Sequence, residues 1–467
     1  MKNWVVIKLN QQIVKAANFK SISISVLFLF IVLFCRNPLL AQDSLHLVPD
    51  SSYKWSLQDC FDYARKNNIQ LQTLAKDVDI NHQNLLQAKA SLLPDLSAST
   101  TQNFTNSKNA NPVVGGFQTQ ANFASNYGVN SSVILYQGGY LKNNIQSQQL
   151  YVQAANLNVQ QAWNDLTIQI TQAYLNILLS KESIVALQNV IQTSQAQYKN
   201  GQILYNAGSI AKNALVQLEA TLATDQYNLV IAQNQLRQNT LTLKQILELP
   251  SNYDFQIQEQ QNIAVPQEAT DLQTVQDSAL QNRPEVKIGQ NAVQQADVQL
   301  KQSYTSGLPT VSAGASLASG YSDNQSNKYI NQLNNNFYQR LGITVGIPIF
   351  NNRLTKTNVE KSKIEIDQSK LSLKNTKLVL SQQVEQAYIN LVNAKAQYQA
   401  AQVQLNANEE NYRIANEQLK LGAVNMVDFL VQKNQYIQAQ QSLIQAKYNV
   451  ILNHGIYEFY MGRPITL

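Results

Sequence analysis

The chain has 467 residues, of which 14% are charged and 44% hydrophobic, so it is long enough for two or three ordinary domains or for one elongated domain. Its formal net charge of +6 is concentrated in the first 41 residues, which contain five basic residues and no acidic one, so the remainder carries only +1. No nucleic-acid partner is therefore expected, because such binding requires a strongly basic surface.

The first 41 residues predict a secretory signal peptide. A basic region ends at Lys20, an apolar stretch covers 22–34, and the small residue Ala41 stands where a signal peptidase would cut. The apolar stretch is shorter than the ~20 residues that a membrane-spanning helix needs. We therefore expect an exported mature chain without an intrachain disulfide, because Cys60 is then its only cysteine.

The next element is a short helix in the sequence SLQDCFDYARKNN, which begins at Ser56. Serine is a preferred N-cap residue. The apolar residues of this segment recur at helical spacing and fall on one face: Leu57, Cys60, Phe61 and Ala64. We interpret Cys60 as a small buried residue of that face and not as a reactive thiol.

Two segments of period two follow, at 95–105 and 127–136. In the second, apolar residues alternate with small and polar ones, the apolar set being Val129, Val133 and Leu135. This alternation predicts strands with one apolar face. The long polar segment between them, 103–126, is expected to be a loop.

A long helix is expected at 139–200, which contains no proline and no interior glycine. Such a helix would be on the order of 90 Å long at 1.5 Å per residue. Apolar residues recur every seven positions at Ile170, Ile177, Ile184, Ile191, Tyr198 and Tyr205, and again at Leu215, Leu222, Leu229, Leu236 and Leu243. This spacing predicts left-handed coiled-coil packing against neighbouring helices.

The second half of the chain repeats the first at a constant offset. The sequence QAYLNILLSKE at Gln172 is matched by QAYINLVNAKA at Gln386, and Gly208 is matched by Gly422, each 214 residues later. Self-similarity over so many positions indicates a tandem duplication of one structural unit.

We place the two repeats at 42–251 and 252–467. The second repeat predicts strands at about 309–319 and 338–350, followed by a long helix at 354–421. Strands of about ten residues with one apolar face fit a barrel in an outer membrane. Four strands cannot close a barrel, so the chain is expected to oligomerise. The alternative is a sheet packed on a soluble core, which the export signal and the long helices disfavour.

Taken in order, these segments resemble the TolC-like outer-membrane efflux protein family. The matching sequences are WSLQDCFDYARKNN, LLPDLSAS, VILYQGG, NRPEVKIGQ, VGIPIFNNR, LGAVNMVDFL and YMGRPITL. The resemblance implies a mainly α fold with a transmembrane β-barrel part. In such a homotrimer each chain gives four strands to a twelve-stranded barrel and its long coiled-coil helices to a periplasmic α-barrel.

The same resemblance implies a place in the outer membrane, in contact with its lipid, with a periplasmic extension. It implies the exit duct of a tripartite efflux pump for drugs, small molecules or metal ions, joined by a periplasmic adaptor protein to an inner-membrane transporter. The exit duct of type I protein secretion is the alternative. A secreted coiled-coil structural protein would explain the heptads but not the paired strands.

The resemblance also places the periplasmic tips, where the adaptor would make contact, at Gly208 and Ser209 and at Gly422 and Asn425. Asp428 falls on the family's first aperture aspartate. Three such carboxylates around a pore axis would form a constriction that favours cations. The alternative is an aspartate that only stabilises the start of a helix.

Some family positions are not matched. The second aperture aspartate corresponds to Val431, and the tyrosine and arginine that lock the tips of some members correspond to Leu419 and Val424. A less polar gate is therefore expected. Ala214 stands in the first repeat where Asp428 stands in the second, which suggests that one tip serves the pore and the other meets a partner.

The sequence contains no motif for catalysis, metal binding or a cofactor. It has no phosphate-binding glycine-rich lysine loop and no HExxH motif, and its three histidines, His46, His82 and His454, lie in unrelated contexts. An exported enzyme is therefore the least favoured class.

Overall fold

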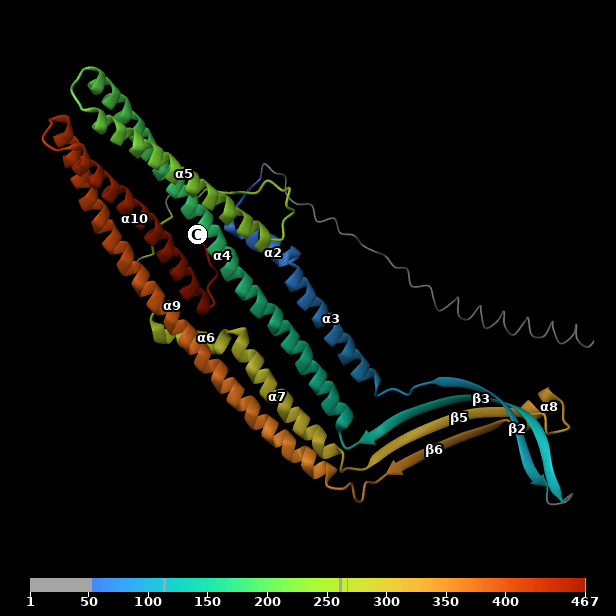
Figure 1. Cartoon of the computed structure of the whole chain (residues 1–467). Helices are drawn as coiled ribbons and strands as arrows, with labels where there is room; N and C mark the ends of the chain where they lie inside the picture. The colour runs from blue at the N-terminus through green and yellow to red at the C-terminus, as the bar shows by residue number, and fades with distance from the viewer. Residues whose placement is uncertain (1–52, 112–114, 260–262, 267, 467) are drawn as a thin grey trace, which may run out of the picture. The chain divides into compact units, whose positions relative to one another are not determined.

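The computed structural model describes residues 53–111, 115–259, 263–266 and 268–466 (Figure 1). The predicted signal peptide lies outside these residues. The first repeat contains β1 (Lys54–Trp55), α2 (Leu57–Asn67), α3 (Ile69–Ala90), β2 (Ser97–Asn111), β3 (Gly116–Gln137), α4 (Tyr140–Asn206) and α5 (Lys212–Ile246). The second contains β4 (Gln256–Ile257), α6 (Leu272–Asn282), α7 (Pro284–Thr305), β5 (Thr310–Ser322), α8 (Tyr329–Asn335), β6 (Tyr338–Gly346), α9 (Leu354–Lys420) and α10 (Met426–Tyr460).

The helices of the two repeats match in length. The pairs α2 and α6, α3 and α7, α4 and α9, and α5 and α10 contain 11, 22, 67 and 35 residues each. The duplication seen in the sequence is therefore a duplication of structure. The short helix α8 has no counterpart among the described residues of the first repeat.

The short helix α2 begins as predicted. Its N-cap Ser56 accepts a hydrogen bond from the Asp59 N–H at 3.1 Å, and the Asp59 carboxylate accepts one from the Ser56 N–H at 2.9 Å. This reciprocal pair is a capping box. The predicted apolar face, including Cys60, is buried. Burial raises the pKa of the Cys60 thiol, with a smaller contribution from the nearby Asp59 charge.

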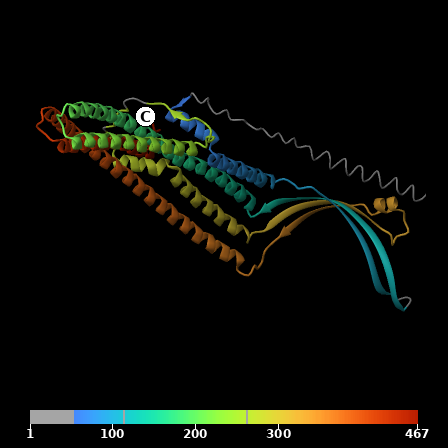
Figure 2. The ribbon, with the colours of Figure 1, turned by 45° about the horizontal axis from the view of Figure 1, so that its top comes forward.

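The long helices form two hairpins, α4 with α5 and α9 with α10, which lie side by side because α10 also contacts α4 (Figures 1 and 2). Most of the residues predicted from the seven-residue spacing are fully or partly buried. The most deeply buried are Ile170, Ile177, Leu243, Val384, Leu391, Phe429, Val450 and Tyr457. Tyr205 is exposed, because the pattern ends at the tip, where α4 has fewer neighbours to pack against.

Four strands form one antiparallel sheet in the order β2-β3-β5-β6. The pairing of β3 with β5 joins the two repeats through backbone hydrogen bonds. Within the described chain, β2 and β6 are the edge strands, and each pairs on one side only. All nine residues of β6 are exposed.

The two faces of the sheet differ in polarity. One face is formed by Tyr136, Val133 and Val129 of β3, Val311, Ala313, Ala315 and Leu317 of β5, and Leu341, Ile343 and Val345 of β6. We call this set the apolar belt. The opposite face, apart from Ile134, carries small or polar residues such as Asn130, Ser312, Ser316, Thr344 and Arg340. The predicted alternation is therefore present, although a register shift between Ile134 and Tyr136 removes Leu135 from the apolar row.

The expectation that 103–126 is a loop is wrong. β2 and β3 stay paired from Ser97 opposite Asn130 to Asn111 opposite Gly116. Their outer halves have no apolar alternation to reveal them, because a two-stranded ribbon in water is held by backbone hydrogen bonds and cross-strand pairs. The predicted strand 338–350 also ends early, at Gly346, since Pro348 lacks the N–H that a ladder needs.

Candidate functional site

The first tip, where α4 turns into α5, is built around Gly208. This residue has a φ of +76°, and its N–H donates to the Tyr205 carbonyl at 2.9 Å, while the Ser209 N–H donates to the Leu204 carbonyl at 2.8 Å. These two bonds define a Schellman C-cap, in which glycine is favoured because side chains resist positive φ. Ser209 is exposed on this turn.

The second tip, between α9 and α10, repeats the same geometry. Gly422 has a φ of +72°, its N–H donates to the Leu419 carbonyl at 3.1 Å, and the Ala423 N–H donates to the Gln418 carbonyl at 2.8 Å. A Cβ atom added to Gly208 or Gly422 would meet no atom within 4 Å. Backbone conformation, not crowding, therefore requires glycine at both tips.

Asp428 lies in the first turn of α10 and is exposed. Its N–H donates to the Asn425 side-chain oxygen at 2.9 Å, and its carboxylate accepts from the Asn425 side-chain nitrogen at 2.7 Å. Asp428 therefore takes part in capping α10, and its exposed carboxylate remains accessible. Val427 and Val431 beside it are also exposed, by 54% and 44%, so the charge stands within an apolar strip of α10.

A buried ionic cluster lies close to the tips and was not predicted. Lys433 of α10 donates from Nζ to Asp225 Oδ2 of α5 at 2.8 Å and to Ser194 Oγ of α4 at 2.6 Å. All three residues are buried. The cluster therefore links the α9–α10 hairpin to both helices of the α4–α5 hairpin.

Aromatic side chains surround this ionic cluster. The ring of Tyr412 stacks on Tyr436, with centroids 5.3 Å apart, and its hydroxyl accepts a hydrogen bond from the Gln197 side chain at 3.2 Å. Phe429 also packs against Tyr412. Burial raises the pKa of the Tyr412 hydroxyl. The two hairpins are thus joined near their tips by both polar and aromatic contacts.

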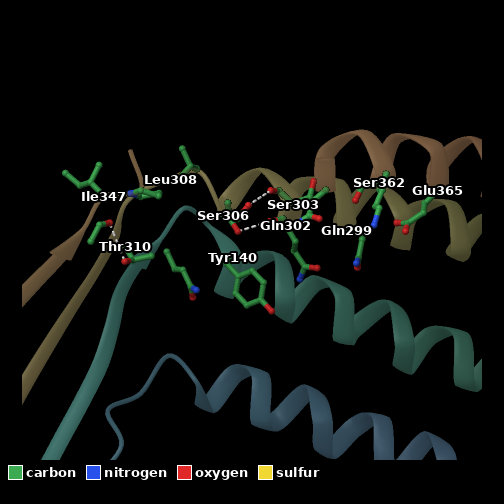
Figure 3. A pocket seen from close by; sticks show the side chains of 16 residues that line it. Tyr140, Gln299, Gln302, Ser303, Ser306, Leu308, Thr310, Ile347, Ser362 and Glu365 are labelled. Carbon is green, nitrogen blue, oxygen red and sulfur yellow. Dashed lines mark hydrogen bonds between the residues drawn. The ribbon is translucent and has the colours of Figure 1, made fainter. Parts of the chain in front are cut away.

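A cavity of about 870 Å³ lies where the helices meet the sheet (Figure 3). Figure 3 shows its lining residues coming from α4, α7 and α9 and from the ends of β5 and β6. The lining is polar and mostly uncharged: Gln299, Gln302, Ser303, Ser306 and Thr310 accompany Lys361 and Glu365. No arrangement of nucleophile, base and acid is present among these residues.

Two further searches of the described ranges gave negative results. They contain no group of three or more histidine, cysteine, aspartate or glutamate side chains that could hold a metal ion. None of the helices described is both long and apolar enough to cross a membrane.

Comparison with known proteins accounts for this combination of an open sheet and long helical hairpins. The sequence profile described as outer membrane efflux protein matches residues 61–248 and 275–453, well over half of the chain. The chain belongs to the outer membrane efflux protein family.

Individual relatives of this outer membrane efflux protein are distant but extensive. Toxin and drug export protein A of Aggregatibacter actinomycetemcomitans is 25% identical over 296 residues, which span 62% of this chain and only 61% of that relative. Outer membrane protein TolC of Escherichia coli (strain K12) is 22% identical over 437 residues, which span 89% of this chain and 84% of TolC. The crystal structure of the Campylobacter jejuni CmeC outer membrane channel has a TM-score of 0.73 at 19% identity and covers 88% of this chain and 87% of CmeC.

These matches confirm the family and the fold inferred from the sequence. The fold is TolC-like, with strands at one end of long helical hairpins. As an outer membrane efflux protein, the chain is located in the outer membrane, with a helical extension in the periplasm. Its family and fold are those of channels and not of enzymes.

Proposed function

We propose that three copies of this outer membrane efflux protein assemble into a channel, and that the channel is the exit duct of a tripartite efflux pump. The observation that carries the proposal is the four-stranded sheet, which has two unsatisfied edges and an exposed apolar belt.

The sheet edges require partners in a membrane. In lipid an unpaired strand edge leaves N–H and C=O groups without water, which costs several kcal/mol for each group. Pairing of β6 with β2 of the next copy satisfies both edges at once, and three copies of four strands make a twelve-stranded barrel. Leu341 and Ile343 of the apolar belt, exposed by 84% and 71% in the single chain, then face lipid.

The helices carry the channel toward the inner membrane. α4 and α9, at 67 residues each, are on the order of 100 Å long. The tips at Gly208 and Gly422 lie at the ends of α4 and α9 that are distant from the strands (Figure 1). We assign the tips to contact with a periplasmic adaptor, which connects the duct to an energised inner-membrane transporter.

Asp428 is assigned to the pore constriction. In a trimer, three exposed carboxylates at one level would attract cations, and the capping bonds from Asn425 would hold each carboxylate in position. The apolar neighbours Val427 and Val431 would make this constriction less polar than a ring of charges alone.

The adaptor contact is tested by photo-crosslinking in cells. A photoreactive amino acid is placed at Ser209 and, in a second variant, at Ala423, which are both exposed and whose tip hydrogen bonds use only the backbone N–H. We expect crosslinks to a periplasmic adaptor from at least one tip. Lys76 of α3, whose side chain is 77% exposed, is the matched control. Crosslinks of equal yield at Lys76, or none at either tip, would contradict the assignment.

The cargo is tested by deleting the gene. A relative is named for toxin and drug export and another for protease secretion. Efflux predicts that the deletion strain accumulates dyes or drugs while its secreted proteins are unchanged. Loss of a secreted protein with normal drug accumulation would instead support the secretion duct.

A further inference from the structure

We infer that the segment formed by α8 and Phe337 is a membrane-surface anchor, which rests on the outer side of the barrel and contacts the lipid at the headgroup boundary. This inference depends on the proposed function, because it requires the apolar belt to face lipid.

The segment folds back onto the apolar side of the sheet. The Ser319 hydroxyl donates to the Leu333 carbonyl at 2.6 Å, and Ser319 follows Leu317 of the apolar belt on the same face of β5. Tyr329 of α8 packs on Tyr321 with ring centroids 4.9 Å apart, and its hydroxyl lies 2.8 Å from that of Tyr127. Tyr127 and Tyr321 belong to this same face.

The fold of the segment is fixed by a buried glutamine. Gln332 is 1% exposed; its side-chain oxygen accepts from the Ser322 N–H at 2.9 Å, and its side-chain nitrogen donates to the Asn327 carbonyl at 2.8 Å. Such satisfied polar contacts hold a seven-residue helix that could not be stable alone. α8 is therefore seated on the strands and is not a free loop.

Aromatic residues gather at this end of the apolar face. Phe104, Phe123, Tyr127 and Tyr321 all project from it, as their strand registers require. The distance along β5 from Val311 to Ser319, eight residues, is about 26 Å at ~3.3 Å per residue. This length matches the apolar band of ~25 Å that outer-membrane barrels place between two aromatic girdles. The aromatic group therefore marks a lipid–water boundary.

The outward side of α8 suits that boundary. Ile330 is 59% exposed and Phe337 is 53% exposed, and the residues between them that remain exposed are all asparagines: Asn331, Asn334, Asn335 and Asn336. A surface with apolar anchors next to uncharged amides fits the boundary between acyl chains and headgroups. A second copy is not the occupant that this surface fits, because α8 lies over the inner strands β5 and β3, away from the edges at which copies would meet.

Tryptophan fluorescence in lipid vesicles tests the inference. Full-length protein carrying Ile330→Trp is reconstituted with phospholipids brominated either near the headgroup or deep in the acyl chain, and the emission of the native tryptophans is subtracted. Ile343→Trp in the apolar belt is the lipid control, and Asn106→Trp in the exposed outer part of β2 is the water control. Retained single-channel conductance shows that each variant is folded.

We expect lipid brominated near the headgroup to quench Ile330→Trp more strongly than deeply brominated lipid does. Iodide should quench it about twofold less than Asn106→Trp, because the boundary shields one side of the residue. If Ile343→Trp is quenched by lipid but Ile330→Trp behaves like Asn106→Trp, the anchor is refuted and the barrel stands. If Ile343→Trp is not quenched by lipid, both the anchor and the membrane barrel are refuted.

Discussion

Lys433 is the residue whose environment departs most from the expectation for its type. Lysine is rarely buried unless it is paired, and here its ammonium group is held by Asp225 and Ser194. A partial signal was present in the sequence: Lys433 lies four residues after Phe429 and three before Tyr436, on the apolar side of α10. The identity of its partner could not be read from the sequence, because the two acidic and basic positions are 208 residues apart.

Removing the ammonium group leaves the Asp225 carboxylate buried without a counter-charge. Lys433→Ala is expected to lower the free energy of unfolding by about 3–5 kcal/mol. Lys420→Ala, which breaks an exposed ion pair with Glu417, should change it by at most about 1 kcal/mol. Unfolding in denaturant measures both. Lys433→Met combined with Asp225→Leu should regain most of the loss; equal effects of Lys433→Ala and Lys420→Ala would contradict the account.

Asp428 combines a capping role with the proposed role in the pore. Asp428→Asn keeps an oxygen that can accept from Asn425 but removes the charge, so it separates the two roles. We expect this variant to fold normally and to show weaker cation preference and weaker cation block in single-channel recordings. Asp367→Ala, an exposed acid of α9 far from the tip, should leave both properties unchanged. Unchanged cation block in Asp428→Asn would remove this residue from the constriction.

Cys60 predicts a dependence of stability on pH. Burial raises the pKa of the thiol in the folded protein, whereas in the unfolded chain it is about 8.5. As the pH rises above that value, the unfolded state loses a proton that the folded state keeps, so the free energy of unfolding falls. The difference between the wild type and Cys60→Ala should therefore shrink from pH 8 to pH 10, by up to ~1.4 kcal/mol per pH unit. A constant difference would contradict a buried thiol.

At the scale of elements, two glycines should respond to alanine with opposite signs. Gly422 has a positive φ, so Gly422→Ala should lower the free energy of unfolding by about 1–2 kcal/mol. Gly455 lies inside α10, where an added Cβ would make only one contact, at 3.4 Å with Ile465. Gly455→Ala should raise it by roughly 0.5–1 kcal/mol. Thermal unfolding of both variants measures the signs, and a loss of stability in both would contradict the C-cap argument.

The long helices were predictable because their seven-residue spacing is maintained over many turns. The main error was to end the first at 200, before Gly201, whereas α4 continues to Asn206. This glycine is retained inside the helix because α5 packs against it: an added Cβ would lie 2.5 Å from Leu218 Cδ1. A sequence pattern cannot distinguish a glycine that ends a helix from one that admits a neighbouring helix.

The strands and α8 were less predictable. Only the parts of the strands that carry the apolar belt alternate, so the outer halves of β2 and β3 were taken for a loop. α8 has no seven-residue spacing, no counterpart in the described part of the other repeat and a stability that depends on Gln332 and on the sheet beneath it. Contacts of this kind arise only after the strands have paired, and no local signal precedes them.

At the scale of the whole molecule, the duplication explains why one chain is incomplete. Two repeats supply two pairs of strands and two hairpins of matching length, yet the sheet keeps two open edges. The two tips share one backbone geometry but differ in chemistry, since Asp428 is replaced by Ala214 in the first repeat. The symmetry therefore belongs to the scaffold, and the proposed functions divide between its two halves.

The central claim is that the functional channel is a trimer. Native mass spectrometry of the detergent-extracted protein, followed by recording of the same sample in a planar bilayer, tests it most directly. The account predicts a mass three times that of the mature chain, together with discrete single-channel currents. A monomer that does not conduct, or a protein recovered without detergent from the periplasmic fraction, would contradict it.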